Sequence, residues 1–270
     1  MQIDRGLMAG VFLGEQRRMQ TVEVCTVAVE RVRIPRQPND IGGILAVPEV
    51  EGTFPAIVVI PTVRGLDEWM ETVTQRLAGG GFVALAVGIF DHPGVPENPL
   101  ERPGAQPDAE ILGDLDAAYN MLRSHPRVGD HPICSWGYCI GGRFALLWPT
   151  YRPELAGTAA FHGFPTNDTS NPNTPTEAAG RVVELKVPVI GSFGEADKLV
   201  PMSAVERYRS ELERHGKDFE INTYPGADHG WTNPRMPSYD QSAAEDCWTK
   251  AVRFLTRRIA AKEQATAGSR

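Results

Sequence analysis

The sequence predicts an α/β fold: a mostly parallel, doubly wound sheet with helices on both faces, preceded by antiparallel strands. Two nearly continuous apolar runs, at 54–60 and 82–89, are typical of strands that helices cover on both faces. A segment with helical spacing of apolar residues, 66–78, separates them and stops at three glycines. Strand-like and helix-like segments then alternate to the end of the chain, which is the pattern of a parallel sheet with crossover helices.

The first part of the chain predicts outer strands. Apolar and polar residues alternate imperfectly over 21–34, as in an antiparallel strand, and 42–47 returns beside it after a turn at 37–40. Residues 1–20 carry scattered charges and lack the apolar core of a secretory signal. We expect them to form a loosely ordered N-terminal extension.

Two long loops interrupt the middle of the chain. Residues 91–107 contain five prolines, so they cannot form regular structure, and their length favours a loop that covers a pocket. A helix is predicted over 108–123 because apolar residues form one stripe there. A second loop, 163–176, follows a short predicted strand at 157–161.

The last third of the chain repeats the alternation of predicted strands and helices. Strands are predicted at 187–193 and 219–224, a helix at 201–215, and a final helix from residue 238. The segment 261–270 is small and polar, and we expect a flexible tail. Because no linker or internal repeat divides the chain, residues 21–260 are predicted to form a single domain.

Charge and composition indicate which partners and which cell compartment to expect. The net charge of −7 comes from dispersed acidic residues without a basic stripe, which argues against a nucleic-acid partner. No apolar run is long enough to cross a bilayer, so no membrane partner is expected. The four cysteines show no paired spacing, which indicates reduced thiols and a cytoplasmic location.

The segment 131–147, HPICSWGYCIGGRFALL, contains a GxCxG pentapeptide centred on Cys139. It lies where a short apolar strand would end and a helix would begin. In a GxSxG elbow the flanking glycines permit a sharp turn that exposes the middle side chain above the sheet. The start of a helix also favours the thiolate form of a cysteine, which is the nucleophile. The alternative is a glycine-rich turn around a buried structural cysteine.

An acid and a histidine follow two later strands. Asp197 comes after the strand at 187–193, and His229 comes after the strand at 219–224. Reacting groups of such sheets lie beyond the carboxyl ends of the strands, so these side chains can meet Cys139. The order nucleophile, acid, histidine is that of α/β-hydrolases. We therefore predict Cys139 as nucleophile, His229 as general base and acid, and Asp197 as the residue that orients His229.

Further residues are candidates for the rest of the site. The backbone amides of Ile140, which follows the nucleophile, and of Val63, in the loop after the strand at 54–60, are the expected oxyanion hole. His92 and His162 both follow predicted strands and are candidates to line the pocket. Trp231, beside His229, is a candidate wall for an apolar substrate.

At three places the chain resembles the dienelactone hydrolase family: GYCIGG at 137–142, the segment around Asp197 that ends in Val200 and Pro201, and ADHG at 227–230. The resemblance spans roughly 22–255. It implies an α/β-hydrolase fold, no metal or organic cofactor, and hydrolysis of a small-molecule ester or lactone through a Cys139 acyl-enzyme.

The chain also departs from the family pattern. Thr62 stands where family members that act on dienelactone carry a glutamate that contacts the resting cysteine. His92 and Asn233 stand near the places of two arginines that hold the substrate carboxylate, and Arg64 and Arg235 are close enough in sequence to substitute. We count Thr62, Arg64, His92 and Asn233 among the predicted substrate-binding residues.

The departures leave two alternatives to hydrolysis. One is an acyl transferase or cyclisation enzyme on the same triad in a biosynthetic pathway. The other is a catalytically idle member that binds a small molecule. We expect a monomer or a homodimer.

Overall fold

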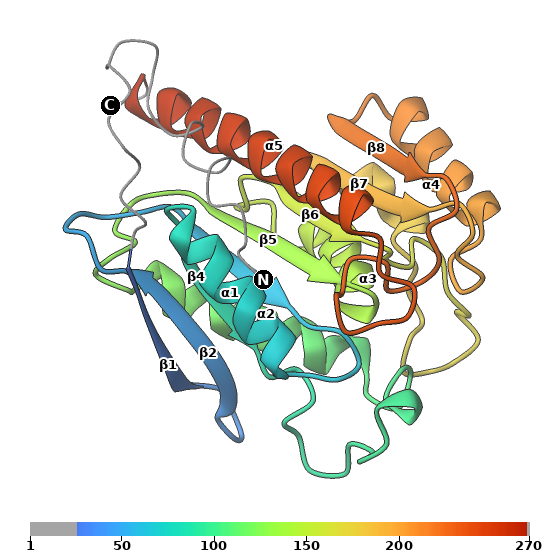
Figure 1. Cartoon of the computed structure of the whole chain (residues 1–270), viewed down its shortest axis with the longest axis horizontal. Helices are drawn as coiled ribbons and strands as arrows, with labels where there is room; N and C mark the ends of the chain where they lie inside the picture. Colours follow the sequence, from blue (N-terminus) through green and yellow to red (C-terminus); the bar gives the residue numbers. More distant parts are fainter. Residues whose placement is uncertain (1–25, 269–270) are drawn as a thin grey trace.

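The computed structural model describes residues 26–268 (Figure 1). The N-terminal extension expected over 1–20, the start of the first predicted strand and Cys25 lie outside these residues. The strands are β1 (Val27–Ile34), β2 (Ile41–Pro48), β3 (Ala56–Ile60), β4 (Val83–Val87), β5 (Ile133–Tyr138), β6 (Thr158–Phe161), β7 (Val189–Gly194) and β8 (Phe219–Tyr224). The α-helices are α1 (Glu68–Gly79), α2 (Asp108–Arg123), α3 (Ile140–Leu147), α4 (Met202–Arg214) and α5 (Gln241–Ala267). Short 3-10 turns are η1 (Pro99–Glu101), η2 (Trp148–Thr150) and η3 (Ala179–Glu184).

Within residues 26–268 the strands form one eight-stranded sheet in the order β1-β2-β4-β3-β5-β6-β7-β8. Every neighbouring pair from β4 to β8 is parallel. The pairs β1–β2 and β2–β4 are antiparallel. The predicted parallel sheet with antiparallel N-terminal strands is confirmed.

Helices cover both faces of the sheet. In β3, Val58 and Ile60 belong to a core packed against α2, α3 and α4, whereas Ile57 and Val59 belong to a core packed against α1 and α5. Figure 1 shows α1 and α5 on the near side of the sheet. Because strand side chains alternate between the faces, double coverage requires apolar residues at consecutive positions, which explains the continuous runs in the sequence.

The structure extends the last helix beyond the predicted end. The segment 261–270 was expected to be a flexible tail, but α5 continues to Ala267. Alanine, lysine, glutamate and glutamine in this segment all favour the helix. The Nζ atom of Lys262 also donates a hydrogen bond of 3.0 Å to the carbonyl oxygen of Leu155, and this bond ties the last turns to the domain.

The prolines of 91–107 prevent a long element, as predicted, but they permit the short turn η1 inside the loop. Between residues 26 and 268 no helix combines the length and the apolar character that crossing a membrane requires.

Candidate active site

Cys139 occupies a strained turn between β5 and α3. Its φ of 56° and ψ of −119° lie where few residues other than glycine are found. The turn depends on its glycines, because a Cβ on Gly137 would lie 2.1 Å from the carbonyl oxygen of Gly141, and one on Gly141 would lie 2.2 Å from that of Ile60. This is the geometry of a nucleophile elbow, and it places the thiol at the carboxyl end of the sheet.

The structure brings Cys139, His229 and Asp197 together. The Nε2 atom of His229 lies 3.1 Å from the Sγ atom of Cys139, and its Nδ1 atom lies 2.8 Å from Oδ2 of Asp197. The other carboxylate oxygen of Asp197 accepts hydrogen bonds from the backbone amides of Leu199, at 2.9 Å, and Val200, at 3.0 Å. These amides fix the carboxylate, so it holds the imidazole in the orientation that faces the thiol.

The electrostatics of the trio favour a charged imidazole. Burial by itself lowers the pKa of His229, but hydrogen bonds to Asp197 and Cys139 and the negative charges of these two groups outweigh it. The net result raises the pKa of His229 to about 10. At neutral pH the imidazole of His229 is therefore protonated, and it faces the thiol of Cys139.

A cavity of about 650 Å³ opens above Cys139 and His229. Both long loops contribute to it, through Leu100 and Pro103 from 91–107 and Phe164 from 163–176. Its volume falls in the range of small-molecule sites. The prediction that 91–107 covers a pocket is confirmed.

The two amides expected to form the oxyanion hole belong to residues that line this cavity. Ile140 is the first residue of α3, so its amide has no partner within the helix. Val63 lies in the loop after β3, and its carbonyl oxygen accepts a hydrogen bond of 2.8 Å from Nη1 of Arg102. Arg102 thus anchors the Val63 loop to the loop 91–107.

Comparison with known proteins identifies the family. The model of the dienelactone hydrolase family matches residues 41–259, which is most of the chain. The chain belongs to the dienelactone hydrolase family. The resemblance that the motifs indicated is thereby confirmed.

Individual relatives agree with this assignment. The chain is 30% identical over 228 residues to a "Putative carboxymethylenebutenolidase" of Methylorubrum extorquens, covering 81% of this chain and 77% of the relative. It is 26% identical to a "Probable 2-oxo-3-(5-oxofuran-2-ylidene)propanoate lactonase" of Bradyrhizobium sp, covering 88% and 97%. A crystal structure of a "Putative Dienelactone Hydrolase" from Klebsiella pneumoniae superposes with a TM-score of 0.79 at 27% identity, covering 86% and 99%.

Four of the predicted substrate-binding residues line the cavity of this family member: Thr62, Arg64, His162 and Asn233. The hydroxyl of Thr62 accepts a hydrogen bond of 3.2 Å from the amide of Arg64, so it is turned toward its own loop. Arg64 is exposed, whereas His162 and Asn233 are buried. Cys139 and His229 are in direct contact, and Thr62 lies on the lining of the same cavity.

Two predicted residues lie elsewhere. His92 was expected to line the pocket, but its Nε2 atom lies 2.7 Å from the buried carboxylate of Asp114, which also pairs with Arg36. Trp231 was expected to wall the cavity, but it is fully buried and packs against Tyr224 with ring centroids 4.6 Å apart. Neither lies on the cavity lining, so both expectations are corrected.

Sequence reasoning missed a buried ion pair beside the cavity. Arg143 of α3 makes a bidentate pair with Asp108 of α2, at 2.6 and 2.8 Å. It also donates to Oδ1 of Asn167 and to the carbonyl oxygen of Thr176, which joins the loop 163–176 to both helices. A charged residue in the helix after the nucleophile was the one available signal, since charges are rarely buried without a partner.

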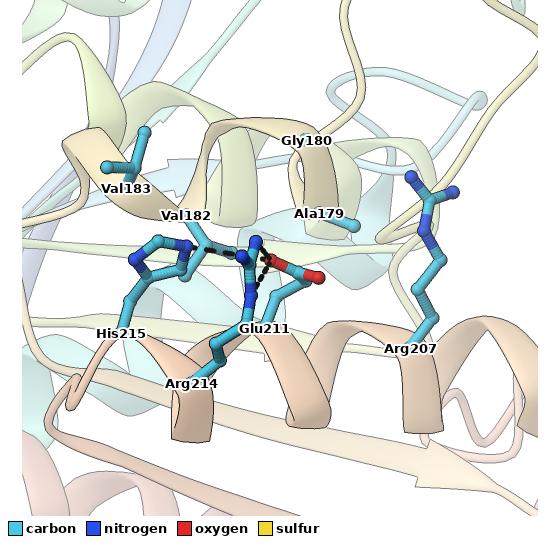
Figure 2. A pocket seen from close by; sticks show the side chains of 8 residues that line it. All are labelled: Ala179, Gly180, Val182, Val183, Arg207, Glu211, Arg214 and His215. Carbon is cyan, nitrogen blue, oxygen red and sulfur yellow. Dashed lines mark hydrogen bonds and ion pairs between the residues drawn. The ribbon is translucent and has the colours of Figure 1, made fainter.

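A second hollow, of about 390 Å³, lies between η3 and α4 (Figure 2). Glu211 in this hollow accepts a hydrogen bond from Nε of Arg214 at 3.2 Å and lies 3.7 Å from Nε2 of His215. Arg207 pairs with Glu177. The cations that line this hollow therefore have carboxylate partners, and no predicted site residue lies among them.

Proposed function

We propose that this member of the dienelactone hydrolase family hydrolyses a small-molecule ester or lactone through an acyl-enzyme on Cys139. The observation that carries the proposal is the continuous chain of contacts from Asp197 through His229 to Cys139, at 2.8 and 3.1 Å. Such a relay supplies a nucleophile, a proton donor and a group that orients the donor.

In the first half of the reaction the Cys139 thiolate attacks the carbonyl carbon, and the carbonyl oxygen becomes an oxyanion. The amides of Ile140 and Val63 stabilise this charge. When the intermediate collapses, the bond to the alcohol oxygen breaks and the His229 imidazolium gives that oxygen its proton. An acyl thioester remains on Cys139, beside a neutral His229. A lactone substrate stays attached because its alcohol is part of the same molecule.

The second half restores the enzyme. Neutral His229 accepts a proton from water as the water oxygen attacks the thioester carbonyl. The new tetrahedral intermediate expels the Cys139 thiolate and releases the product as a carboxylic acid, which ionises in water. Asp197 stabilises the imidazolium that returns, so the thiolate and imidazolium with which the proposed reaction begins form again.

The cavity lining supports a substrate with a sizeable apolar body. Besides the loop residues named above, its apolar walls come from Trp69, Ile140, Leu199 and Met236. Arg64 stands exposed at this lining and is suited to pair with a carboxylate on the substrate. A cytoplasmic setting fits the mechanism, because a reducing compartment keeps the nucleophile as a free thiol.

The test compares Cys139→Ala with Cys247→Ala on a panel of activated aryl esters and unsaturated lactones. Cys247 is a buried free thiol on α5 and serves as the matched control. We expect Cys139→Ala to lose turnover while its circular dichroism spectrum stays that of the parent, and Cys247→Ala to retain turnover. Hydrolysis by a folded Cys139→Ala protein at the parent rate would overturn the proposal.

A further inference from the structure

His162 lies beside Cys139 and His229 but has no role in the proposed proton transfer among Cys139, His229 and Asp197. It directly follows β6, as Cys139 follows the neighbouring β5, and its ring meets that of His229 edge to face with centroids 4.8 Å apart. One ligand-type atom each from Cys139, His162 and His229 lies within 4.8 Å of the others. A thiolate and two imidazoles are the ligands that zinc prefers.

We propose that Cys139, His162 and His229 form an inhibitory site for a thiophilic divalent metal ion such as Zn²⁺. The site differs from a cofactor site, because the ion would occupy the atoms that catalysis uses. The inhibition rests on the proposed function, whereas binding of the metal rests on the geometry alone.

The surroundings of both histidines match those of metal ligands. Metal-binding histidines usually give their second ring N–H to a carboxylate or another acceptor, which fixes the ring. The Nδ1 atom of His229 faces Asp197, and the Nε2 atom of His162 lies 3.0 Å from the hydroxyl oxygen of Thr232. The Nδ1 atom of His162 is buried, and among residues 26–268 it has no hydrogen-bond partner. That nitrogen is free to supply a lone pair.

The distances require little movement. With metal–ligand bonds of about 2.0 to 2.3 Å, tetrahedral ligand atoms lie about 3.5 Å apart. Sγ of Cys139 and Nε2 of His229 are already 3.1 Å apart, so only His162 must approach. The fourth position would face the cavity and take water or a substrate atom.

Binding of the ion would block both groups that catalysis uses. When Zn²⁺ binds, Nε2 of His229 exchanges its proton for the metal, and one proton passes to solvent. The thiolate and the imidazole are then both occupied, so neither nucleophilic attack nor proton transfer can proceed.

Cobalt provides the direct test, because a thiolate bound to Co²⁺ gives a charge-transfer band in the near ultraviolet. The full-length protein, kept reduced with a non-thiol reagent, is titrated with Co²⁺ and then with Zn²⁺. We expect the band to appear with Co²⁺ and to vanish as Zn²⁺ displaces it. Zn²⁺ should also abolish ester hydrolysis, and EDTA should restore it.

Variants assign the ligands. Cys139→Ser should lose the band, and His162→Asn should weaken Co²⁺ binding by about tenfold or more. Asparagine is chosen because it tolerates the φ of 39° at this position. If that variant is misfolded, Thr232→Val tests the same ligand through its partner and should weaken binding by about tenfold. His215→Asn, on the surface hollow, is the control and should bind as the parent does.

Absence of the band in the parent protein would overturn the proposal. A band that persists in Cys139→Ser, or binding unchanged in folded His162→Asn or Thr232→Val, would also overturn it. Because the band does not depend on turnover, a failure of metal binding is distinguishable from a failure of the hydrolase assignment.

Discussion

The substitution Asp197→Asn tests how the relay sets the charge of His229. The pKa of His229 is raised from 6.5 to about 10. At about 1.36 kcal/mol per pH unit, this corresponds to roughly 5 kcal/mol in favour of the protonated imidazole. Asp197 supplies one of the two hydrogen bonds and one of the two negative charges responsible. Its removal should lower the pKa of His229 by about 1 to 3 pH units.

The geometry also predicts that His229 adopts the wrong tautomer in Asp197→Asn. Oδ1 of Asp197 accepts hydrogen bonds from the amides of Leu199 and Val200, and a side-chain amide would keep its oxygen there. Its NH₂ group would then point at Nδ1 of His229 and force the ring proton onto Nε2. In that state His229 cannot take a proton at the nitrogen that faces Cys139. We expect a loss of kcat of about a thousandfold to ten-thousandfold.

The assay is the pH dependence of kcat/KM with an activated ester. His229 must be protonated to serve the leaving group, so activity is present below its pKa and is lost as the pH rises through about 10. In Asp197→Asn the fall in kcat/KM at alkaline pH should occur at a lower pH than in the parent protein. Asp228→Asn is the matched control, because Oδ1 of Asp228 accepts its hydrogen bond from the backbone amide of His229, at 2.7 Å, whereas Asp197 faces the ring. An alkaline fall in kcat/KM that stays at the same pH in Asp197→Asn, or equal effects of both variants, would show that Asp197 does not set the charge of His229.

The surroundings of the cysteines and of two arginines predict three further results. Iodoacetamide at neutral pH should label Cys139 before Cys134, because burial raises the pKa of Cys134 to about 12; peptide mapping that finds equal labelling would contradict this. Arg102→Gln should lower kcat about tenfold in a folded protein, since it frees the loop that supplies an oxyanion donor; an unchanged kcat would exclude that anchoring role. Arg143→Met should lower the free energy of unfolding by about 3 to 5 kcal/mol in urea titrations, because it leaves the buried Asp108 carboxylate unpaired; a loss below about 1 kcal/mol would show that the pair is dispensable.

The features that the sequence predicts well are those that local chemistry determines. Strand β3 was predictable because burial on both faces demands apolar side chains at every position. The convergence of Cys139, Asp197 and His229 was predictable because each follows a strand, and parallel strands end at the same edge of the sheet. The glycines around Cys139 marked the turn, since no larger residue fits there.

The features that the sequence did not predict depend on partners far away in the chain. His92 follows β4 as expected, but Asp114 of α2 holds it away from the cavity, together with Arg36. Trp231 is only two residues from His229, yet its side chain enters the core beside Tyr224. Periodicity and spacing do not encode such long-range contacts, which arise only when the loops pack.

The acyl-enzyme on Cys139 is tested most directly by mass spectrometry of the intact protein, quenched within the first turnover of an activated ester or lactone. We expect the mass to increase by that of the acyl group, carried by the peptide that contains Cys139, and this increase to disappear as the product appears. In Cys139→Ala no such adduct should form. Rapid turnover without any adduct, or an acyl group on another residue, would contradict the claim that Cys139 is the nucleophile.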